Sequence, residues 1–309
     1  MPVIFSFPGF EAIARYIASD LAMTRGDVTI RHFPDGETYV RLNSPVEDQD
    51  VIIVCGLDNP DQKIMGLMFF AQVARDMGAK SIGLVAPYLG YMRQDKRFQD
   101  GEAVTADLFA AFLSDMLDWL ITVDPHLHRH ESLSEIYSIP ATVLHISELM
   151  AAWIKFNISK PLLIGPDEES AQWVSDVAQK AGAPYMVLTK IRHGDRDVDV
   201  SLPDVTAYHD YTPVLIDDII STARTMIETV GHLKTLKMKP PICIAIHAIF
   251  AGEAYENLTA CGAQKIVTSN SILHHSNGIA IEDMLSKAVG LLKLMGPDPK
   301  VARKSKGLH

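Results

Sequence analysis

Apolar runs of strand length alternate along the whole chain with segments whose apolar residues recur at helical spacing. One helical face, 64–74, is placed to end at Gly78; others span 108–116 and 171–178, the latter closed by Gly182. Alternation of strand and helix predicts an α/β fold of parallel sheets with helices on both faces. The predicted strands are Val51–Val54, Ser81–Ala86, Leu120–Val123, Leu162–Ile164, Met186–Leu188, Val214–Ile216, Ile242–Ile246 and Lys265–Thr268.

The alternating pattern restarts near residue 149, and 309 residues suffice for two domains of ordinary size. We therefore expect two similar parallel-sheet α/β domains, residues 1–149 and 150–309, with the tail from about residue 280 able to pack back on the first domain. Segments 98–105 and 192–203 are polar and poor in periodicity, which is typical of loops that cover a site.

The net charge of −10 argues against a chain that coats nucleic acid or binds a membrane through basic residues, so neither partner is expected. Phosphate ligands are not excluded, because a few local Arg and Lys residues suffice for them. No apolar run approaches the ~18 residues of a membrane span, and the N-terminus lacks the pattern of a secretion signal. Cys55, Cys243 and Cys261 cannot make a paired disulfide framework and indicate a reducing compartment, so we expect a cytoplasmic protein.

The segment Val214–Thr225 carries the clearest sign of chemistry. An apolar run ends in Asp217 and Asp218, and small hydroxyl residues follow before a helical pattern begins at Met226. Backbone N–H groups at a helix N-terminus, aided by the helix dipole, suit a phosphate, and paired acids beside them suit sugar hydroxyls or Mg²⁺. The alternative is a strand end capped by Asp and Ser. The segment resembles the fingerprint of type I phosphoribosyltransferase folds, which hold ribose-5-phosphate groups.

A second segment, Ala86–Arg97, follows a predicted strand, where the ligands of open α/β sheets gather. Arg93 can fork onto phosphate oxygens, and Gln94 can both donate and accept hydrogen bonds to a nucleotide. Composition alone would favour a solvated charged loop. The order Pro-Tyr-x-Gly-Tyr-x-Arg-Gln-Asp-Lys, however, is similar to the ATP-binding segment of the ribose-phosphate diphosphokinase, or PRPP synthetase, family. This resemblance implies that Arg93 and Gln94 contact ATP.

Further segments resemble this family in family order and cover both expected domains. The flag segment of the family reaches across a dimer interface, which implies that Phe33, Asp35 and Glu37 embrace the adenine held by a neighbouring subunit. A homo-oligomer of at least two chains is therefore expected, and family members form tetramers or hexamers. The matching segments are the flag at Phe33–Glu37, the Asp-x-His metal region at Asp124–His126, an acid at Asp167, the Lys-x-Arg opening of the catalytic loop at Lys190–Arg192, and a strand at Val267–Ile272.

The resemblance also implies the reaction and the role of each site residue. The anomeric hydroxyl of ribose-5-phosphate would attack the β-phosphorus of Mg·ATP, releasing AMP and forming 5-phosphoribosyl 1-diphosphate. Asp217 and Asp218 would hold the 2- and 3-hydroxyls, and Lys190 and Arg192 would stabilise the transferring group. The 5-phosphate would be bound by Ser221, Thr222, Ala223, Arg224 and Thr225.

The expected cofactor is Mg²⁺, with His126 and Asp167 as metal residues and His126 also at the ATP. Mg²⁺ prefers oxygen, so His126 would act either directly or through water. The alternating His126, His128 and His130 could instead suggest a transition metal, although we expect the latter two on the surface.

Three departures from the family pattern stand out. Arg224 occupies a position where the family usually has Gly, and its side chain could either crowd the phosphate or add a cation to it. Glu168 and Glu169 replace glycines; they could recruit metal, repel the sugar phosphate, or favour the start of a helix. The stretch 97–102 is more like the archaeal-type enzymes, so weak or no inhibition by ADP is expected.

Two other functions remain open at this point. A non-catalytic PRPP-synthetase-like regulatory or binding protein is favoured by Arg224 and by the two glutamates, but it would not explain why Lys190, Arg192 and the paired acids are all present. A phosphoribosyltransferase that consumes PRPP needs only one such domain. The chain has no P-loop, no G-x-G-x-x-G after a strand and no G-x-S-x-G, so P-loop kinases, dinucleotide enzymes and α/β-hydrolases are not supported.

Overall fold

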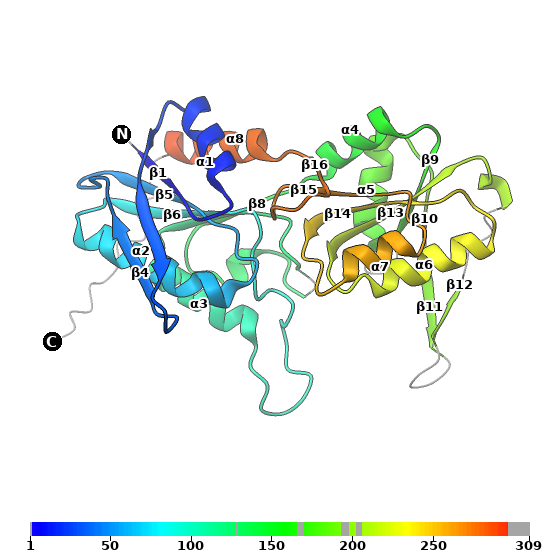
Figure 1. Cartoon of the computed structure of the whole chain (residues 1–309), viewed down its shortest axis with the longest axis horizontal. Coiled ribbons are helices and arrows are strands. Elements are labelled where there is room, and N and C mark those ends of the chain that lie inside the picture. The colour runs from blue at the N-terminus through cyan, green and yellow to red at the C-terminus, as the bar shows by residue number, and fades with distance from the viewer. Residues whose placement is uncertain (1, 128, 166–169, 193–197, 202–205, 296–309) are drawn as a thin grey trace.

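A computed structural model shows two parallel sheets that lie side by side along the long axis of the molecule (Figure 1). The structure describes residues 2–127, 129–165, 170–192, 198–201 and 206–295. In each sheet the second strand of the unit lies outside the first, and the later strands follow in chain order on the other side. The two units therefore share one topology, which confirms the predicted α/β fold with two similar parallel-sheet units.

The first sheet has the order β2-β1-β5-β6-β7-β8, and every pair in it is parallel. Its strands are β1 (Val3–Ser6), β2 (Thr24–Arg25), β5 (Asp50–Val54), β6 (Ser81–Ala86), β7 (Trp119–Val123) and β8 (Ala141–Leu144). The helices connecting them are α1 (Glu11–Asp20), α2 (Pro60–Asp76) and α3 (Thr105–Met116), and the 3₁₀ turn η1 (Leu133–Glu135) precedes β8.

The second sheet has the order β10-β9-β13-β14-β15-β16, again parallel throughout. Its strands are β9 (Pro161–Gly165), β10 (Tyr185–Val187), β13 (Thr212–Ile220), β14 (Ile242–Ala248), β15 (Lys265–Ser269) and β16 (Asn277–Ile279). The helices of this unit are α4 (Ser147–Asn157), α5 (Ala171–Ala181), α6 (Arg224–Thr235) and α7 (Ala254–Ala260), with the 3₁₀ turn η3 (Thr206–Tyr208) before β13.

Two antiparallel hairpins stand away from the sheets. One is formed by β3 (Val28–His32) and β4 (Thr38–Leu42), and it projects beside α2 in the first unit (Figure 1). The other is formed by β11 (Thr189–Arg192) and β12 (Val198–Ser201) and extends from the far end of the second unit (Figure 1). These arms place the predicted flag and catalytic-loop segments outside the packed layers.

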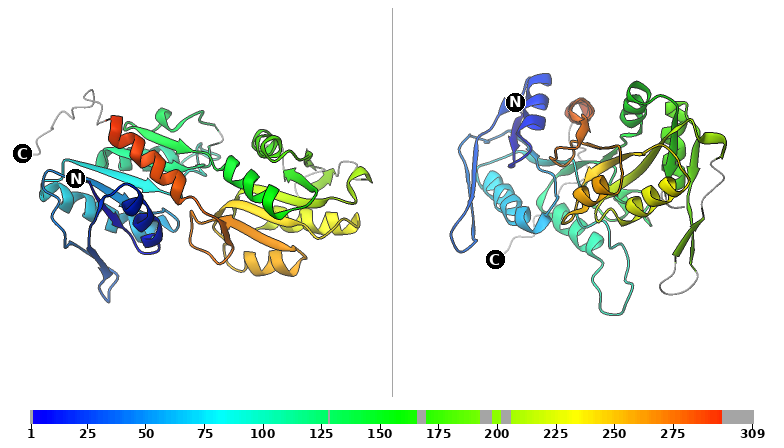
Figure 2. Two further views of the ribbon diagram at one scale, coloured as in Figure 1. Left: turned by 90° about the horizontal axis from the view of Figure 1, so that it is seen from above. Right: turned by 45° about the vertical axis from the view of Figure 1, so that its right-hand side comes forward.

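The last described helix, α8 (Glu282–Met295), returns from the second unit to the first and lies beside α1 (Figure 2). The Ser286 hydroxyl donates a hydrogen bond of 2.6 Å to the Asp20 carboxylate. One cluster of buried side chains runs through both units and includes Ile17, Ile154 and Leu285. Continuous apolar burial of this kind ties the two units together, and the boundary at 149/150 stays a prediction.

All of the predicted strands are present, but β13 is longer than expected. The prediction ended this strand at Ile216, whereas the structure continues it to Ile220, so Asp217 and Asp218 lie inside the strand rather than after it. The physical reason is that Ile219 and Ile220 renew the apolar pattern and pair with β14. The predicted helix end at Gly182 is confirmed: its φ of 66° is the left-handed conformation that favours glycine.

Candidate functional site

A cavity of about 360 Å³ lies where the carboxyl end of β13 meets the loop that follows β7. It therefore contacts both units, at the strand ends where ligands of open α/β sheets bind. The structure brings to it all seven residues predicted for ribose-5-phosphate, together with Arg93 and His126. The cavity is lined by Arg93, Asp124, Pro125, His126, Leu127, Ser170, Trp173, Asp217, Asp218, Ile219, Ile220, Ser221, Thr222, Ala223, Arg224, Thr225, Met226 and Ile246.

The turn between β13 and α6 forms one wall of this cavity. Ala223 has a φ of 58° and precedes the first residue of α6, so the chain reverses sharply before the helix starts. The segment after β14 holds this turn in place, because the backbone N–H groups of Phe250 and Ala251 donate to the carbonyls of Ile220 and Ser221. The first N–H groups of a helix have no partner within it, so a rigid turn here offers donors to an anion.

Asp218 and His126 meet across the cavity, one from each unit. Nδ1 of His126 lies 2.5 Å from Oδ2 of Asp218, and the other carboxylate oxygen of Asp218 accepts from the Ile219 N–H at 2.7 Å. Burial by itself raises the pKa of Asp218, but the hydrogen bond and charge of His126 outweigh burial and lower the pKa to about 2. Asp218 is therefore a carboxylate at neutral pH and can accept hydrogen bonds from sugar hydroxyls.

Asp124 holds the loop that carries His126. Its carboxylate accepts hydrogen bonds from Nδ1 of His145 at 2.7 Å and from the backbone N–H of Ile146 at 2.8 Å, just before α4 begins. The hydrogen bond to Asp124 raises the pKa of His145. The Asp124 carboxylate thus braces this loop, and within the Asp-x-His segment His126 is the residue that reaches Asp218.

The predicted ATP-binding loop is only partly at the cavity. Arg93 lines it, and its Nη1 lies 3.4 Å from the Ser221 hydroxyl, which joins the loop after β6 to the phosphate turn. Gln94 is not among the lining residues; its side-chain amide faces Glu102 at 3.5 Å. The loop is anchored by Asp95, whose carboxylate pairs with Arg129 at 2.5 Å. Arg93 is therefore placed for a ligand that also touches the phosphate turn, whereas Gln94 faces the adjoining loop.

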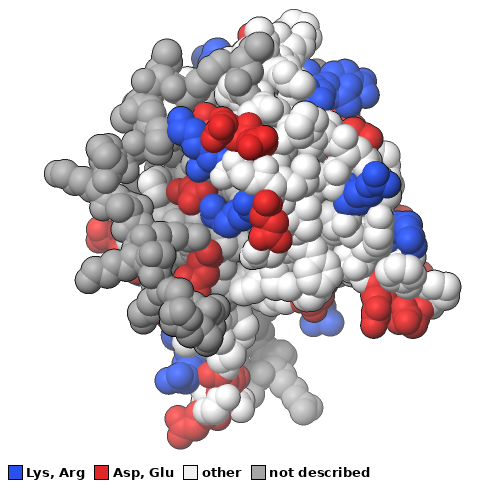
Figure 3. Space-filling model, turned by 90° about the vertical axis from the view of Figure 1, so that its left-hand side faces the viewer, with Lys and Arg blue, Asp and Glu red and all other residues white. Residues whose placement is uncertain are grey.

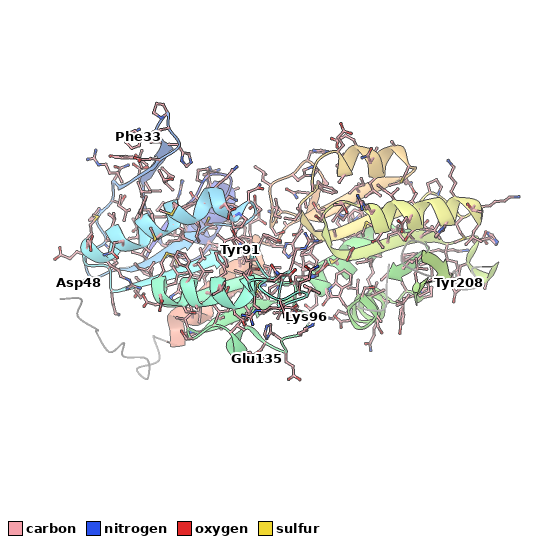
Figure 4. All side chains as sticks on the ribbon, turned by 90° about the horizontal axis from the view of Figure 1, so that it is seen from below. Phe33, Asp48, Tyr91, Lys96, Glu135 and Tyr208 are labelled. Carbon is pink, nitrogen blue, oxygen red and sulfur yellow. The ribbon has the colours of Figure 1, made fainter. Side chains whose placement is uncertain are left out.

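The flag residues lie far from this cavity. Phe33, Asp35 and Glu37 form the tip of the β3–β4 hairpin, where the N–H of Phe33 donates to the Glu37 carbonyl at 2.8 Å. The guanidinium of Arg31 packs over the rings of both Phe33 and Tyr39. Figure 4 shows Phe33 at the outer end of this arm, well away from Tyr91 and Lys96. Within one chain, the flag residues and the cavity form two separate places.

For three predicted site residues the structure describes only the backbone or nothing. Lys190 and Arg192 belong to β11, which pairs with β12 in the register Lys190↔Val200 and Arg192↔Val198, but their side chains lie outside the described part of the chain. Asp167 lies outside the described residues altogether, as do Glu168 and Glu169. Among the residues that the structure describes, no group of three or more His, Cys, Asp or Glu side chains could hold a metal ion.

Sequence reasoning overlooked two residues of this region. Trp173 lines the cavity from the first turn of α5, and a Trp on a helix gives no local sign of such a role. His247 is buried at the end of β14, where a lone His after an apolar run was the available signal. His130, which was expected on the surface, is partly exposed, and its Nδ1 lies 3.0 Å from Glu135.

Comparison with known proteins identifies the family. Residues 2–116 match the N-terminal domain of ribose phosphate pyrophosphokinase, and residues 132–273 match the phosphoribosyl transferase domain. A ribose-phosphate pyrophosphokinase of Saccharolobus solfataricus is 32% identical over 286 residues, which cover 91% of this chain and 95% of that protein. The chain belongs to the ribose-phosphate pyrophosphokinase family. A relative of the same name from Methanobrevibacter smithii is 29% identical over 90% of this chain and 97% of its own length.

A solved structure shares the fold of the whole chain. The crystal structure of phosphoribosylpyrophosphate synthetase from Mycobacterium smegmatis superimposes with a TM-score of 0.83 and covers 96% of this chain and 100% of that one, at 22% identity.

Within the part of the chain that the structure describes, no helix is long and apolar enough to cross a membrane. On the face shown in Figure 3, the acidic and basic side chains that are described lie interspersed among uncharged ones.

Proposed function

We propose that this chain transfers the diphosphoryl group of Mg·ATP to the anomeric hydroxyl of ribose-5-phosphate, giving 5-phosphoribosyl 1-diphosphate and AMP. Membership of the ribose-phosphate pyrophosphokinase family supports this activity. The observation that carries the proposal is the single cavity that joins a phosphate-binding turn, two carboxylates, Arg93 and His126. A phosphorylated sugar and a nucleotide triphosphate are the ligands that this set of groups fits.

The sugar phosphate takes the β13 side of the cavity. Its 5-phosphate accepts hydrogen bonds from the N-terminal amides of α6 and from the hydroxyls of Ser221, Thr222 and Thr225, where the helix dipole favours an anion. Asp217 and Asp218 accept hydrogen bonds from the 2- and 3-hydroxyls. Holding the ring at both ends fixes the anomeric oxygen for in-line attack, and such positioning supplies a large share of a phosphoryl-transfer rate.

The polyphosphate of ATP takes the side formed by the loops after β6 and β7, where Arg93 and His126 lie. Mg²⁺ is usually held by one or two carboxylates together with substrate phosphates rather than by a cage made only of protein groups. The carboxylates of Asp217 and Asp218 fit such an ion, with Asp167 and His126 as further candidates. When bound, the ion supplies positive charge to the oxygens of the transferring group.

In the transfer step, the anomeric oxygen forms a bond to the β-phosphorus and gives up its proton, which passes to water. The bond between that phosphorus and the oxygen bridging it to the α-phosphorus breaks, and AMP leaves with the electron pair. Lys190 and Arg192 stabilise the charge on the transferring diphosphate and on the departing AMP. Their arm, β11–β12, stands clear of the packed layers, so it can approach the cavity when the substrates are bound.

A complete ATP site needs a second chain. The flag residues of one chain stand at the tip of the β3–β4 arm, away from the cavity of the same chain. Phe33 can cover the adenine only in a neighbouring subunit, so the active form is at least a dimer. A cytoplasmic location, where both substrates are available, remains our prediction.

The decisive experiment mixes purified protein with ribose-5-phosphate, ATP and Mg²⁺ and follows AMP and 5-phosphoribosyl 1-diphosphate together. We expect both products in equal amounts, and no AMP when ribose replaces ribose-5-phosphate, because the phosphate turn would then be empty. Saturable binding of either substrate without AMP would instead support a regulatory binding protein. The family comparison favours the enzyme over that alternative, because the relatives it matches are ribose-phosphate pyrophosphokinases.

A further inference from the structure

His247 lies near the carboxyl end of β14, next to the cavity-lining Ile246, and contacts residues of the first unit. The residue is 1% exposed. Its Nε2 lies 3.2 Å from the carbonyl oxygen of Asp124 in the loop after β7. Its ring meets Tyr88, in the loop after β6, edge to face with centroids 4.9 Å apart. One side chain of the second sheet thus touches both loops that the first sheet contributes to the ATP side.

The hydrogen bonds assign the protonation of this ring. Burial lowers the pKa of His247, so the ring is neutral near pH 7 and carries one N–H. A carbonyl oxygen can only accept, so the proton is on Nε2 and is donated to Asp124. Nδ1 then accepts from the Ser271 hydroxyl at 2.8 Å, and Ser271 is in turn 2.9 Å from the Ser269 hydroxyl. Each ring nitrogen has a suitable partner.

The accepting residue has a backbone conformation that is unusual for a residue other than glycine. Asp124 has a φ of 33°, a conformation that costs a non-glycine residue free energy and persists only where its surroundings fix it. Its N–H donates to the Leu144 carbonyl at 2.9 Å, and its carboxylate is held by Ile146, so the first unit fixes two of its groups. The hydrogen bond from His247 fixes the remaining one, the carbonyl, from the second unit.

We propose that His247 is a positioning residue, which holds the Asp124 carbonyl so that His126, two residues further on, meets Asp218 across the cavity. The kinetic effect of this residue rests on the proposed function. Without His247 the sugar would still bind correctly, but the loop on the ATP side would be displaced, so diphosphoryl transfer would be slower. His247 touches neither substrate. Its removal therefore lowers kcat while binding of ribose-5-phosphate, which depends on α6 and β13, changes little.

A pair of amide variants separates the two hydrogen bonds. In His247→Gln the amide nitrogen reaches as far as Nε2 and can still donate to Asp124. In His247→Asn the amide ends where Nδ1 lies, so it can meet Ser271 but not Asp124. We expect kcat to fall by about tenfold or more in His247→Asn and by less than about threefold in His247→Gln, with KM for ribose-5-phosphate within about twofold of wild type in both.

A second readout does not depend on turnover. Hydrogen exchange of the backbone amides of 121–127 is measured by mass spectrometry on the full chain without substrates. We expect faster exchange in His247→Asn, and wild-type exchange in His247→Gln, because only the latter keeps the Asp124 carbonyl bonded. Equal exchange and equal kcat in the two variants would overturn the proposal.

Two other results of these experiments would also be informative. If His247→Asn does not fold, His247→Leu takes its place: leucine fills much of the ring's volume but cannot donate to the Asp124 carbonyl, so exchange of 121–127 should rise, and unchanged exchange would overturn the proposal. If wild-type protein makes no AMP, the proposed function fails, but the exchange comparison still decides whether His247 holds the loop.

Discussion

At the scale of single residues, Asp218 is the point where the two units meet chemically. It accepts from His126, and that contact holds its pKa at about 2, so it enters the reaction fully ionised. In Asp218→Asn the shape remains while the negative charge is lost. We expect kcat for AMP formation to fall by roughly 10²-fold, because the ribose hydroxyls and His126 both lose their charged partner.

The matched control for this variant is Asp210→Asn, which removes an exposed carboxylate outside the cavity and should leave kcat unchanged. Rates would be compared for proteins whose circular dichroism spectra agree with wild type. Near-normal turnover of a folded Asp218→Asn protein would remove this residue from the sugar site.

Arg224, the departure from the family pattern at the phosphate turn, also lines the cavity. It is the first residue of α6 and its side chain is exposed, so it has room beside a bound phosphate rather than filling the space for one. We expect Arg224→Gln to raise KM for ribose-5-phosphate by about threefold to tenfold, the worth of one exposed charged contact, with Arg224→Lys intermediate. A lower KM in Arg224→Gln would show that the guanidinium crowds the phosphate.

At the scale of elements, the β11–β12 arm carries the predicted catalytic cations. We expect Lys190→Ala to lose turnover on the order of 10³-fold while ATP binding, followed by calorimetry, stays within a few-fold of wild type, because the lysine acts on charge that develops during transfer. The control is Lys160→Ala, which removes an exposed lysine outside the cavity. Near-normal turnover of Lys190→Ala would contradict the assignment of this arm.

The buried histidine at the end of β14 leads us to predict how the free energy of unfolding depends on pH. Burial lowers the pKa of His247 below its ordinary value of 6.5. The unfolded chain therefore takes up a proton at this residue near that pH while the folded protein does not, so the free energy of unfolding falls as pH drops below 6.5. Urea unfolding at about pH 7.5 and about pH 5.5 should show a smaller loss in His247→Gln than in wild type, since Gln does not titrate. Identical losses would contradict a neutral buried ring.

The sequence was sufficient to predict elements with a strong apolar pattern. It was not sufficient for elements whose burial is decided by neighbouring segments. Long apolar runs such as Ile242–Ile246 and a helix closed by Gly182 have local causes, so they could be predicted. The strands Val3–Ser6 and Asn277–Ile279 and the helix α4 are short or only weakly patterned, and tertiary packing decides them. The continuation of β13 through its two acids depends on pairing with β14, which no local pattern shows.

The candidate site divides in the same way. Motif resemblance found the phosphate turn, Arg93 and His126, which the structure brings to one cavity. It did not find His247, whose importance comes from a contact with Asp124, 123 positions earlier in the chain. Contacts between distant segments leave little trace in a single sequence, because each partner looks ordinary in its own surroundings.

At the scale of the whole molecule, the separation of flag and cavity within one chain predicts shared active sites. The variant Phe33→Ser lacks a working flag but keeps Lys190, and Lys190→Ala lacks the catalytic lysine but keeps its flag. Each variant alone should be nearly inactive, because every site in it lacks one of the two parts. Co-expressed in equal amounts, the two chains form mixed pairs in which one site combines an intact catalytic arm with an intact flag from its neighbour. We expect activity to return to about a quarter of wild type, since half of the random pairs are mixed and half of their sites are intact.

Light scattering supplies the independent check on this prediction. The wild-type protein should have at least twice the mass of one 34.1 kDa chain at working concentration. A monomer with full activity would mean that the flag closes on its own cavity or has no part in the ATP site. An oligomer whose mixed chains regain no activity would instead show that the interface is formed elsewhere and that Phe33 serves the chain that carries it.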